Sequence, residues 1–157
     1  MDVSIERAAA DDAPALVQAQ IAAFHYDAVL YPGVEIGGPP GYDSTVEMLR
    51  LMREGECYKI LAGGRCVGGM VIFDMGNGHF HLGVIFLEPA YQNRGIGTQA
   101  MQFIEDTYPA SRWTLDTPAW AVRNHHFYEK FGYLNVGEHN DGDTPLIVYE
   151  KRSARDL

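Results

Sequence analysis

The stretch YQNRGIGTQAM, residues 91–101, constrains the fold of this chain more than any other part of its sequence. Its glycines, Gly95 and Gly97, open a segment whose apolar residues recur with helical spacing. The run GHFHLGVIFLEP before it, residues 78–89, has the composition of a long strand. A glycine-rich turn at a helix N-terminus exposes backbone N–H groups and the positive end of the helix dipole. This order of elements therefore predicts a site for an anion such as a diphosphate.

The same glycine spacing occurs in dinucleotide-binding folds, where an acidic residue about twenty positions further on binds the ribose. Asp116 stands near that position. In those folds the first glycine follows the strand directly, whereas here seven residues separate Leu87, the last apolar residue of the strand, from Gly95. The turn is too wide for a nicotinamide dinucleotide. We expect Asp116 instead to lie at the end of a strand and to cap the turn before Pro118.

Length and charge narrow the classes of function. A chain of 157 residues is the usual size of one domain, so we predict a single domain over residues 1–157. Its net charge of −9 disfavours nucleic acid and anionic membranes as partners and favours cationic small molecules. No apolar run reaches transmembrane length, and the first residues lack the pattern of a signal peptide. We expect a cytoplasmic protein, whose oligomeric state the sequence leaves open, with a homodimer among the allowed states.

The remaining elements follow from periodicity and turn residues. The predicted order is β-αα-βββ-α-β-α-ββ, which indicates an α/β fold with a mixed sheet of about seven strands and four helices on both faces. Ser44 and Glu47 form a capping box at the start of the second helix. Gly63 and Gly64 predict a two-residue hairpin turn that pairs Leu61 with Cys66 and Cys57 with Met70. In that register the two thiols cannot form a disulfide.

Two motifs resemble the GNAT superfamily of N-acetyltransferases. LEPAYQNRGIGTQAM contains the acetyl-CoA loop pattern Q/R-x-x-G-x-G/A, and NHHFYEKFGY follows about thirty residues later. The sequence match is concentrated in residues 81–137, while the predicted element order matches nearly the whole chain. The resemblance implies the GNAT fold and acetyl-CoA as cosubstrate. Its pyrophosphate is then expected on the backbone of residues 93–98; the implied loop contacts are Gln92, Asn93, Arg94, Gly95, Ile96, Gly97 and Thr98.

The second motif supplies further implied roles. Asn124 and Tyr128 are four residues apart and share one face of a helix. By resemblance, Asn124 holds the pantetheine arm with Phe127 beside it, and the Tyr128 hydroxyl protonates the departing thiolate. By the same resemblance, the backbone N–H of Ile85 polarises the thioester carbonyl, and Leu87 pairs with the pantetheine amides.

Acetyl transfer also needs a group that accepts the proton of the amine, because an amine with a pKa near 10.4 is mostly protonated at neutral pH. His79 and His81 alternate along the predicted strand and point to one face. His81 falls where the histone-acetylating members of the family carry a catalytic glutamate, and an imidazole has a suitable pKa. We predict His81 as the base, with Glu35 and Asp43 as alternatives.

The acceptor is expected to bind near the Gly- and Pro-rich loop after the first helix. Aromatic and acidic residues there favour a cationic, partly apolar amine. The candidates are Tyr26, Tyr31, Glu35, Tyr42 and Asp43. The sequence thus predicts an acetyl-CoA-dependent N-acetyltransferase that acts on a small amine by direct transfer, without a metal or a covalent enzyme intermediate. The alternative is a non-catalytic acyl-CoA-binding or sensing module on the same fold.

Overall fold

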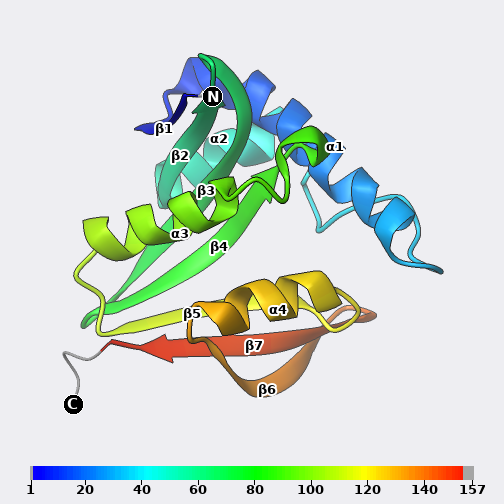
Figure 1. The fold of residues 1–157 in the computed structure, drawn as a ribbon, viewed down its shortest axis with the longest axis vertical. Helices are drawn as coiled ribbons and strands as arrows, with labels where there is room; N and C mark the ends of the chain where they lie inside the picture. The colour runs from blue at the N-terminus through cyan, green and yellow to red at the C-terminus, as the bar shows by residue number, and fades with distance from the viewer. Residues whose placement is uncertain (1, 154–157) are drawn as a thin grey trace. The chain divides into compact units, whose positions relative to one another are not determined.

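A computed structural model describes residues 2–153 of the chain, which form four helices and a seven-stranded sheet (Figure 1). The helices are α1 (Ala13–Leu30), α2 (Thr45–Glu54), α3 (Ile96–Thr107) and α4 (Val122–Lys130). The strands are β1 (Val3–Arg7), β2 (Glu56–Ala62), β3 (Arg65–Gly76), β4 (His79–Leu87), β5 (Arg112–Pro118), β6 (Leu134–Asp141) and β7 (Thr144–Arg152). The strand order is β1-β2-β3-β4-β5-β7-β6. This order and the parallel pairing of β4 with β5 confirm the predicted mixed sheet.

The chain divides into two compact units. The described part of the first unit comprises residues 2–73 and 84–108, and that of the second comprises residues 74–83 and 109–153. Strands β3 and β4 each begin in one unit and end in the other. The single domain over residues 1–157 stays a prediction.

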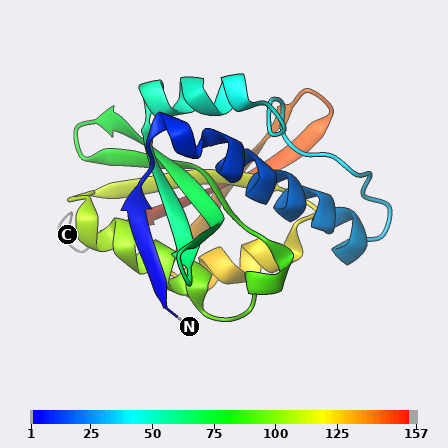
Figure 2. The same cartoon turned by 90° about the horizontal axis from the view of Figure 1, so that it is seen from above.

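The first unit buries one face of α1 and α2, which run next to each other (Figure 2). Their apolar core includes Leu16, Met48, Val71 and Phe86. Half of the predicted capping box at the start of α2 is confirmed, because the Ser44 hydroxyl accepts a hydrogen bond of 3.1 Å from the Glu47 N–H. The reciprocal half is absent, since the Ser44 N–H donates to the Gly41 carbonyl and the Glu47 carboxylate pairs with Arg50. The loop between the two helices is therefore tied down at the end where α2 begins.

The β2–β3 hairpin confirms one predicted pair and corrects the other. Leu61 faces Cys66, as the Gly63-Gly64 turn requires. Cys57 faces Val71 and not Met70, because the register shifts between Ile60 and Leu61. Both thiols are free, and burial raises the pKa of the Cys57 thiol to about 11. A thiol that is protonated at neutral pH is a poor nucleophile.

The second unit is built on β5, β7 and β6, which pair antiparallel in that spatial order (Figure 1). The first residues of β4 extend this sheet, since His79, Phe80 and His81 pair in parallel with Arg112, Trp113 and Thr114. Helix α4 ends at Lys130, and Gly132, two residues further on, has a φ of +88°, in the left-handed region that glycine favours after a helix. Trp113 and Tyr149 are buried in this unit.

Asp116 does not have either of its expected roles at a strand end. It lies inside β5, where it pairs with Val148, and the strand continues to Pro118. Its carboxylate contacts the imidazole of His139 at 3.3 Å. The expectation that Asp116 caps the turn before Pro118 is therefore wrong, because β7 keeps β5 extended through the proline.

Candidate active site

The glycine loop of the first unit has the backbone of an anion site. A short 3₁₀ turn, Pro89–Tyr91, leads out of β4, and α3 begins at Ile96. Asn93 and Gly95 both have positive φ, +61° and +81°. A Cβ at Gly95 would meet no heavy atom within 4 Å, so it is the backbone conformation, and not space, that favours glycine there. Left-handed residues just before a helix N-terminus turn successive N–H groups toward one side.

Side chains tie this loop to the end of β4. The Gln92 amide donates a hydrogen bond of 3.0 Å to the Leu87 carbonyl, so the side chain of the first motif residue holds the loop in shape. Arg65 forms an ion pair of 2.8 Å with Glu88. The Arg94 guanidinium lies over the Tyr91 ring, 5.6 Å from its centroid. The loop is thus preorganised, and Arg94 is exposed at its surface.

Three of the predicted loop residues differ in what they can offer a ligand. Ile96 is buried, so only its backbone can face an anion, whereas Asn93 and Thr98 are exposed. Ile85 is half-buried in β4, at the part of the strand that belongs to the first unit.

The predicted acceptor residues lie on α1 and on the loop that follows it, all in the first unit. Tyr31 is buried, Tyr26 and Tyr42 are half-buried, and Glu35 and Asp43 are exposed. The Tyr42 hydroxyl is hydrogen-bonded to His25 at 2.7 Å, which fixes the loop against α1.

Sequence reasoning missed one acidic residue of this region. The carboxyl of Asp27, on the last turns of α1, has its pKa raised to about 6 by burial. Asp27 directly follows the predicted acceptor residue Tyr26 in the sequence, and this neighbourhood could have identified it as a further candidate.

Helix α4 of the second unit carries the second motif. The Asn124 amide donates to the Thr117 hydroxyl at 3.2 Å. Tyr128 is only 7% exposed, and its ring contacts those of Phe127, Tyr133 and Tyr149. Burial raises the pKa of the Tyr128 phenol, which keeps it protonated at neutral pH. Within residues 2–153 no side chain forms a hydrogen bond to this hydroxyl, so it is a donor without a protein acceptor.

Two histidines of β4 converge on one hydroxyl of β5, as their predicted common face requires. His79 Nε2 and His81 Nδ1 each lie 2.7 Å from Thr114 Oγ1. Arg112 Nη2 lies 2.8 Å from His79 Nδ1. Burial lowers the pKa of His81, and burial together with the Arg112 charge lowers that of His79. Both rings are therefore neutral at pH 7.

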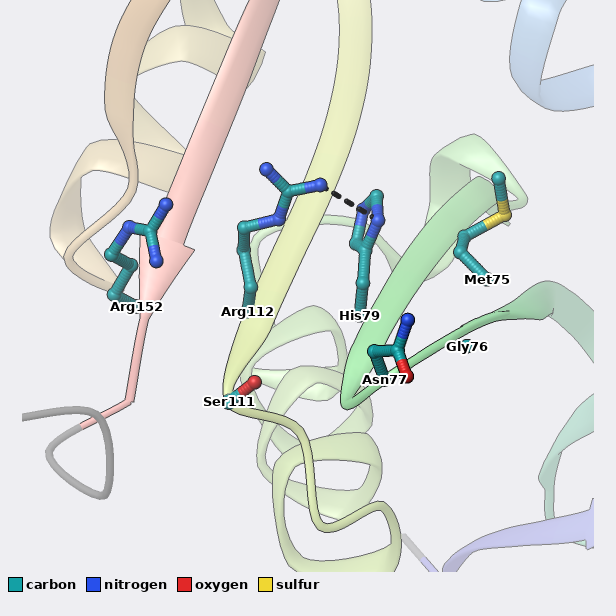
Figure 3. Close-up of a pocket in the computed structure, with 7 residues that line it drawn as sticks. All are labelled: Met75, Gly76, Asn77, His79, Ser111, Arg112 and Arg152. Carbon is teal, nitrogen blue, oxygen red and sulfur yellow. Dashed lines mark hydrogen bonds between the residues drawn. The ribbon is translucent and has the colours of Figure 1, made fainter.

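His79 and Arg112 also line an open pocket of about 610 Å³ in the second unit (Figure 3). Figure 3 shows the two side chains next to each other, with Arg152 of β7 on the far side of Arg112. Glu150 offsets these charges, because its carboxylate lies 2.8 Å from Arg152 and 3.9 Å from Arg112. No local sequence pattern indicated this arrangement, because it depends on the pairing of three strands.

The structure thus places the predicted residues in two groups. The first unit holds the glycine loop, Ile85, Leu87 and the acceptor residues. The second holds Asn124, Tyr128 and His81. In the described part of the chain, no three His, Cys, Asp or Glu side chains gather where they could hold a metal. Over the same residues, no helix is both long and apolar enough to span a membrane.

Solved structures show that this fold is shared with acetyltransferases. The PaiA N-acetyltransferase from Thermoplasma acidophilum, solved in complex with coenzyme A, has a TM-score of 0.77 at 16% identity, over 98% of this chain and all of that one. The ribosomal-protein-S18-alanine N-acetyltransferase from Escherichia coli has a TM-score of 0.75 at 14% identity, over 99% of each chain. At such identities the likeness concerns the fold alone.

Sequence comparisons identify the family. YrkN, an uncharacterized protein of Bacillus subtilis, is 33% identical over 107 residues, which cover 66% of this chain but only 58% of YrkN. The S-(2-succino)cysteine N-acetyltransferase of the same organism is 27% identical over 122 residues, 69% of this chain and 72% of that protein. The model of the acetyltransferase (GNAT) family matches residues 24–133, more than two thirds of the chain. The chain therefore belongs to the GNAT acetyltransferase family, as the two motifs predicted.

Proposed function

We propose that this protein is an N-acetyltransferase that moves the acetyl group of acetyl-CoA directly to a small amine. The observation that carries the proposal is the glycine loop, where Asn93 and Gly95 take left-handed conformations just before α3. A diphosphate bound there would accept hydrogen bonds from the N–H groups of residues 93–98, and Arg94 would add a charge-assisted contact. Membership of the family supports acetyl transfer in general.

The proposed roles of the other residues follow the chemistry of a thioester. The Ile85 N–H polarises the carbonyl, and Leu87, Asn124 and Phe127 bind the pantetheine arm. A thiol with a pKa of about 8.5 leaves as a thiolate, which needs a hydrogen-bond and proton donor. Tyr128 supplies it, and the support is a phenol that is buried, protonated and without a protein acceptor within residues 2–153.

The attacking amine must lose a proton, and we propose that one of the three predicted candidates accepts it. His81 is half-buried and neutral, whereas Glu35 and Asp43 are exposed on the acceptor loop. Burial and charge alone do not rank these three side chains as bases. The hydrogen bond of His81 Nδ1 to Thr114 does distinguish His81 from the two carboxylates.

The acceptor we propose is a small, cationic and partly apolar amine. Three tyrosines supply aromatic faces, namely Tyr26, Tyr31 and Tyr42, and Glu35 and Asp43 supply negative charge. The net charge of −9 favours the approach of cations. The relative from Bacillus subtilis, by its name, acetylates S-(2-succino)cysteine. An acceptor with carboxylates is therefore the natural competitor to a cationic one.

An amine screen tests the proposal. Release of coenzyme A from acetyl-CoA is followed with a thiol reagent in the presence of cationic amines, amino acids and S-(2-succino)cysteine. We expect turnover with at least one cationic amine and weaker turnover with the dicarboxylate. Acetyl-CoA binding, measured by calorimetry, without turnover of any amine class would instead support the sensing module. Binding of NADH but not of acetyl-CoA would refute both.

A further inference from the structure

Four side chains of the second unit form a continuous hydrogen-bonded chain. Arg112 Nη2 contacts His79 Nδ1 at 2.8 Å, and His79 Nε2 contacts Thr114 Oγ1 at 2.7 Å. Thr114 Oγ1 in turn contacts His81 Nδ1 at 2.7 Å. We call this series of contacts the arginine relay. It starts at the pocket of Figure 3 and ends at the histidine predicted to take part in catalysis.

The arginine sets the direction of every hydrogen bond in the relay. A guanidinium can only donate, so His79 Nδ1 must accept. A neutral imidazole carries one proton, so that of His79 is on Nε2 and is donated to Thr114 Oγ1. Thr114 then has one hydrogen of its own to place.

His81 receives that hydrogen. Among the described residues Thr114 Oγ1 has hydrogen bonds only to the two rings, so its single hydrogen finds an acceptor at His81 Nδ1. If His81 donated instead, the hydroxyl would accept twice and its own hydrogen would lack a protein partner. The proton of neutral His81 is therefore on Nε2.

We propose that Arg112 is a positioning residue that, through His79 and Thr114, holds neutral His81 in the tautomer with its proton on Nε2. His81 then donates a hydrogen bond from Nε2 and accepts at Nδ1, where Thr114 already donates. The inference rests on the proposed function only for its consequence in catalysis, since the tautomer belongs to the protein alone.

That consequence changes the role of His81. To accept the proton of an amine, the ring would have to take it at Nδ1 and lose the hydrogen bond from Thr114. The nitrogen that the relay leaves uncommitted already carries a proton. His81 is therefore a hydrogen-bond donor to the reacting molecules, and the role of base passes to Glu35 or Asp43.

The charges around the relay agree with neutral rings. Asp116 raises the pKa of His81, but burial lowers it by more. Burial and the charge of Arg112 lower the pKa of His79 by more than Glu150 raises it. Glu150 also lies near Arg112, at 3.9 Å, and keeps that guanidinium from facing the rings with an unbalanced charge.

The test is nitrogen NMR of the histidine rings in protein without acetyl-CoA or amine, at pH 7.5. Long-range proton–nitrogen correlation spectra show which ring nitrogen carries the proton. In the wild type we expect Nε2–H for both His79 and His81. Arg112→Met removes the obligate donor, so the relay can run in either direction, and a population of Nδ1–H His81 should appear.

Matched variants separate the relay from general effects of mutation. Arg152→Met removes a neighbouring guanidinium of the same pocket and should leave both tautomers unchanged. Thr114→Val should release His81 like Arg112→Met, whereas Thr114→Ser keeps a hydroxyl and should retain the wild-type pattern. Thr114→Val also serves if Arg112→Met does not fold.

Two results would overturn the inference. One is a wild-type His81 with its proton on Nδ1, and the other is an unchanged His81 tautomer when the relay is cut at Arg112 or Thr114. The NMR measurement uses neither a ligand nor turnover. A protein that proved to be inactive would therefore leave the inference about the His81 tautomer intact. Conversely, an active enzyme with the wrong tautomer refutes the relay and leaves the proposed acetyl transfer standing.

Discussion

The hydroxyl of Tyr128 can be tested separately from its ring. Tyr128→Phe keeps the contacts with Phe127, Tyr133 and Tyr149 but removes the proton donor. Loss of general-acid catalysis costs about 10²-fold or more in kcat, whereas acetyl-CoA affinity should barely change. Steady-state kinetics measures kcat, and calorimetry on the same samples measures the affinity for acetyl-CoA.

Tyr149→Phe is the matched control for this prediction. Its hydroxyl also lies in the second unit but donates at 2.7 Å to Glu129, so its loss should leave kcat nearly unchanged. If Tyr128→Phe turned over as fast as the wild type, Tyr128 would be a packing residue.

The role of His81 follows from how its variants respond to pH. A donor role predicts that His81→Ala loses about tenfold in rate, the value of one neutral hydrogen bond, and that His81→Gln recovers most of it. A base role predicts that both lose about 10²-fold or more, because Gln cannot accept the proton. Rates at sub-saturating amine, measured from pH 5 to pH 9, distinguish the two.

The sign of the pH effect is fixed by the lowered pKa of His81. A basic His81 would make the rate of the wild type rise with pH through a value below its ordinary 6.5, and both variants would lack that rise. The second rise, at higher pH, belongs to the amine and persists in all of them. We expect the pH–rate profile of His81→Gln to have the same shape as that of the wild type. If His81→Gln lost only the rise at lower pH, His81 would be the base.

At the scale of residues, the sequence predicted which residue types the site contains and how they are spaced, but not the hydrogen bonds between their side chains. Asn124 and Tyr128 were found because helix geometry puts them on one face, and His79 and His81 because strand geometry does the same. Arg112 and Thr114 were not found, since their contacts depend on the register of β4 against β5. That register is a long-range property that no local pattern of this chain encodes.

Among the elements, the turn before α3 is the one on which the proposed binding of the acetyl-CoA diphosphate depends. Gly97 lies in the first turn of α3, within the proposed diphosphate contact. Gly97→Glu places a carboxylate where an anion should bind, so acetyl-CoA affinity should fall by about 10²-fold or more while the fold remains. Calorimetry with acetyl-CoA measures the loss, and circular dichroism reports on the helices.

A glutamate elsewhere controls for the added charge. Gly37 lies in the acceptor loop, where a Cβ would meet no heavy atom within 4 Å, so Gly37→Glu changes the net charge equally at a tolerant position. It should bind acetyl-CoA like the wild type. A folded Gly97→Glu protein with unchanged affinity would show that the diphosphate does not bind at this loop.

The order of elements was predictable, and its irregularities were not. Periodicity and the N-cap at Ser44 are local signals, and they placed every helix and strand in the right order. The bulge between Ile60 and Leu61 and the extension of β5 past Asp116 arise from pairing with β3 and β7. Both irregularities therefore depend on partner strands that are distant in the sequence.

For the whole molecule, the open question is whether the two compact units unfold together. Strands β3 and β4 each pass through both units without a break, so unfolding one unit takes away part of a strand from the other. This continuity supports the proposal of a single domain over residues 1–157. Chains of about this size commonly unfold in one cooperative transition.

The positions of the tryptophans make this proposal testable. Both tryptophans of the chain, Trp113 and Trp120, belong to the second unit, whereas α1, α2 and α3 belong to the first. Fluorescence therefore follows the second unit, and far-ultraviolet circular dichroism follows mainly the helices of the first. In a urea titration we expect the two curves to coincide, with one midpoint and one slope. A fluorescence midpoint clearly separated from that of the dichroism signal would show two units that unfold independently, because a cooperative domain cannot lose the environment of its tryptophans while its helices stay folded.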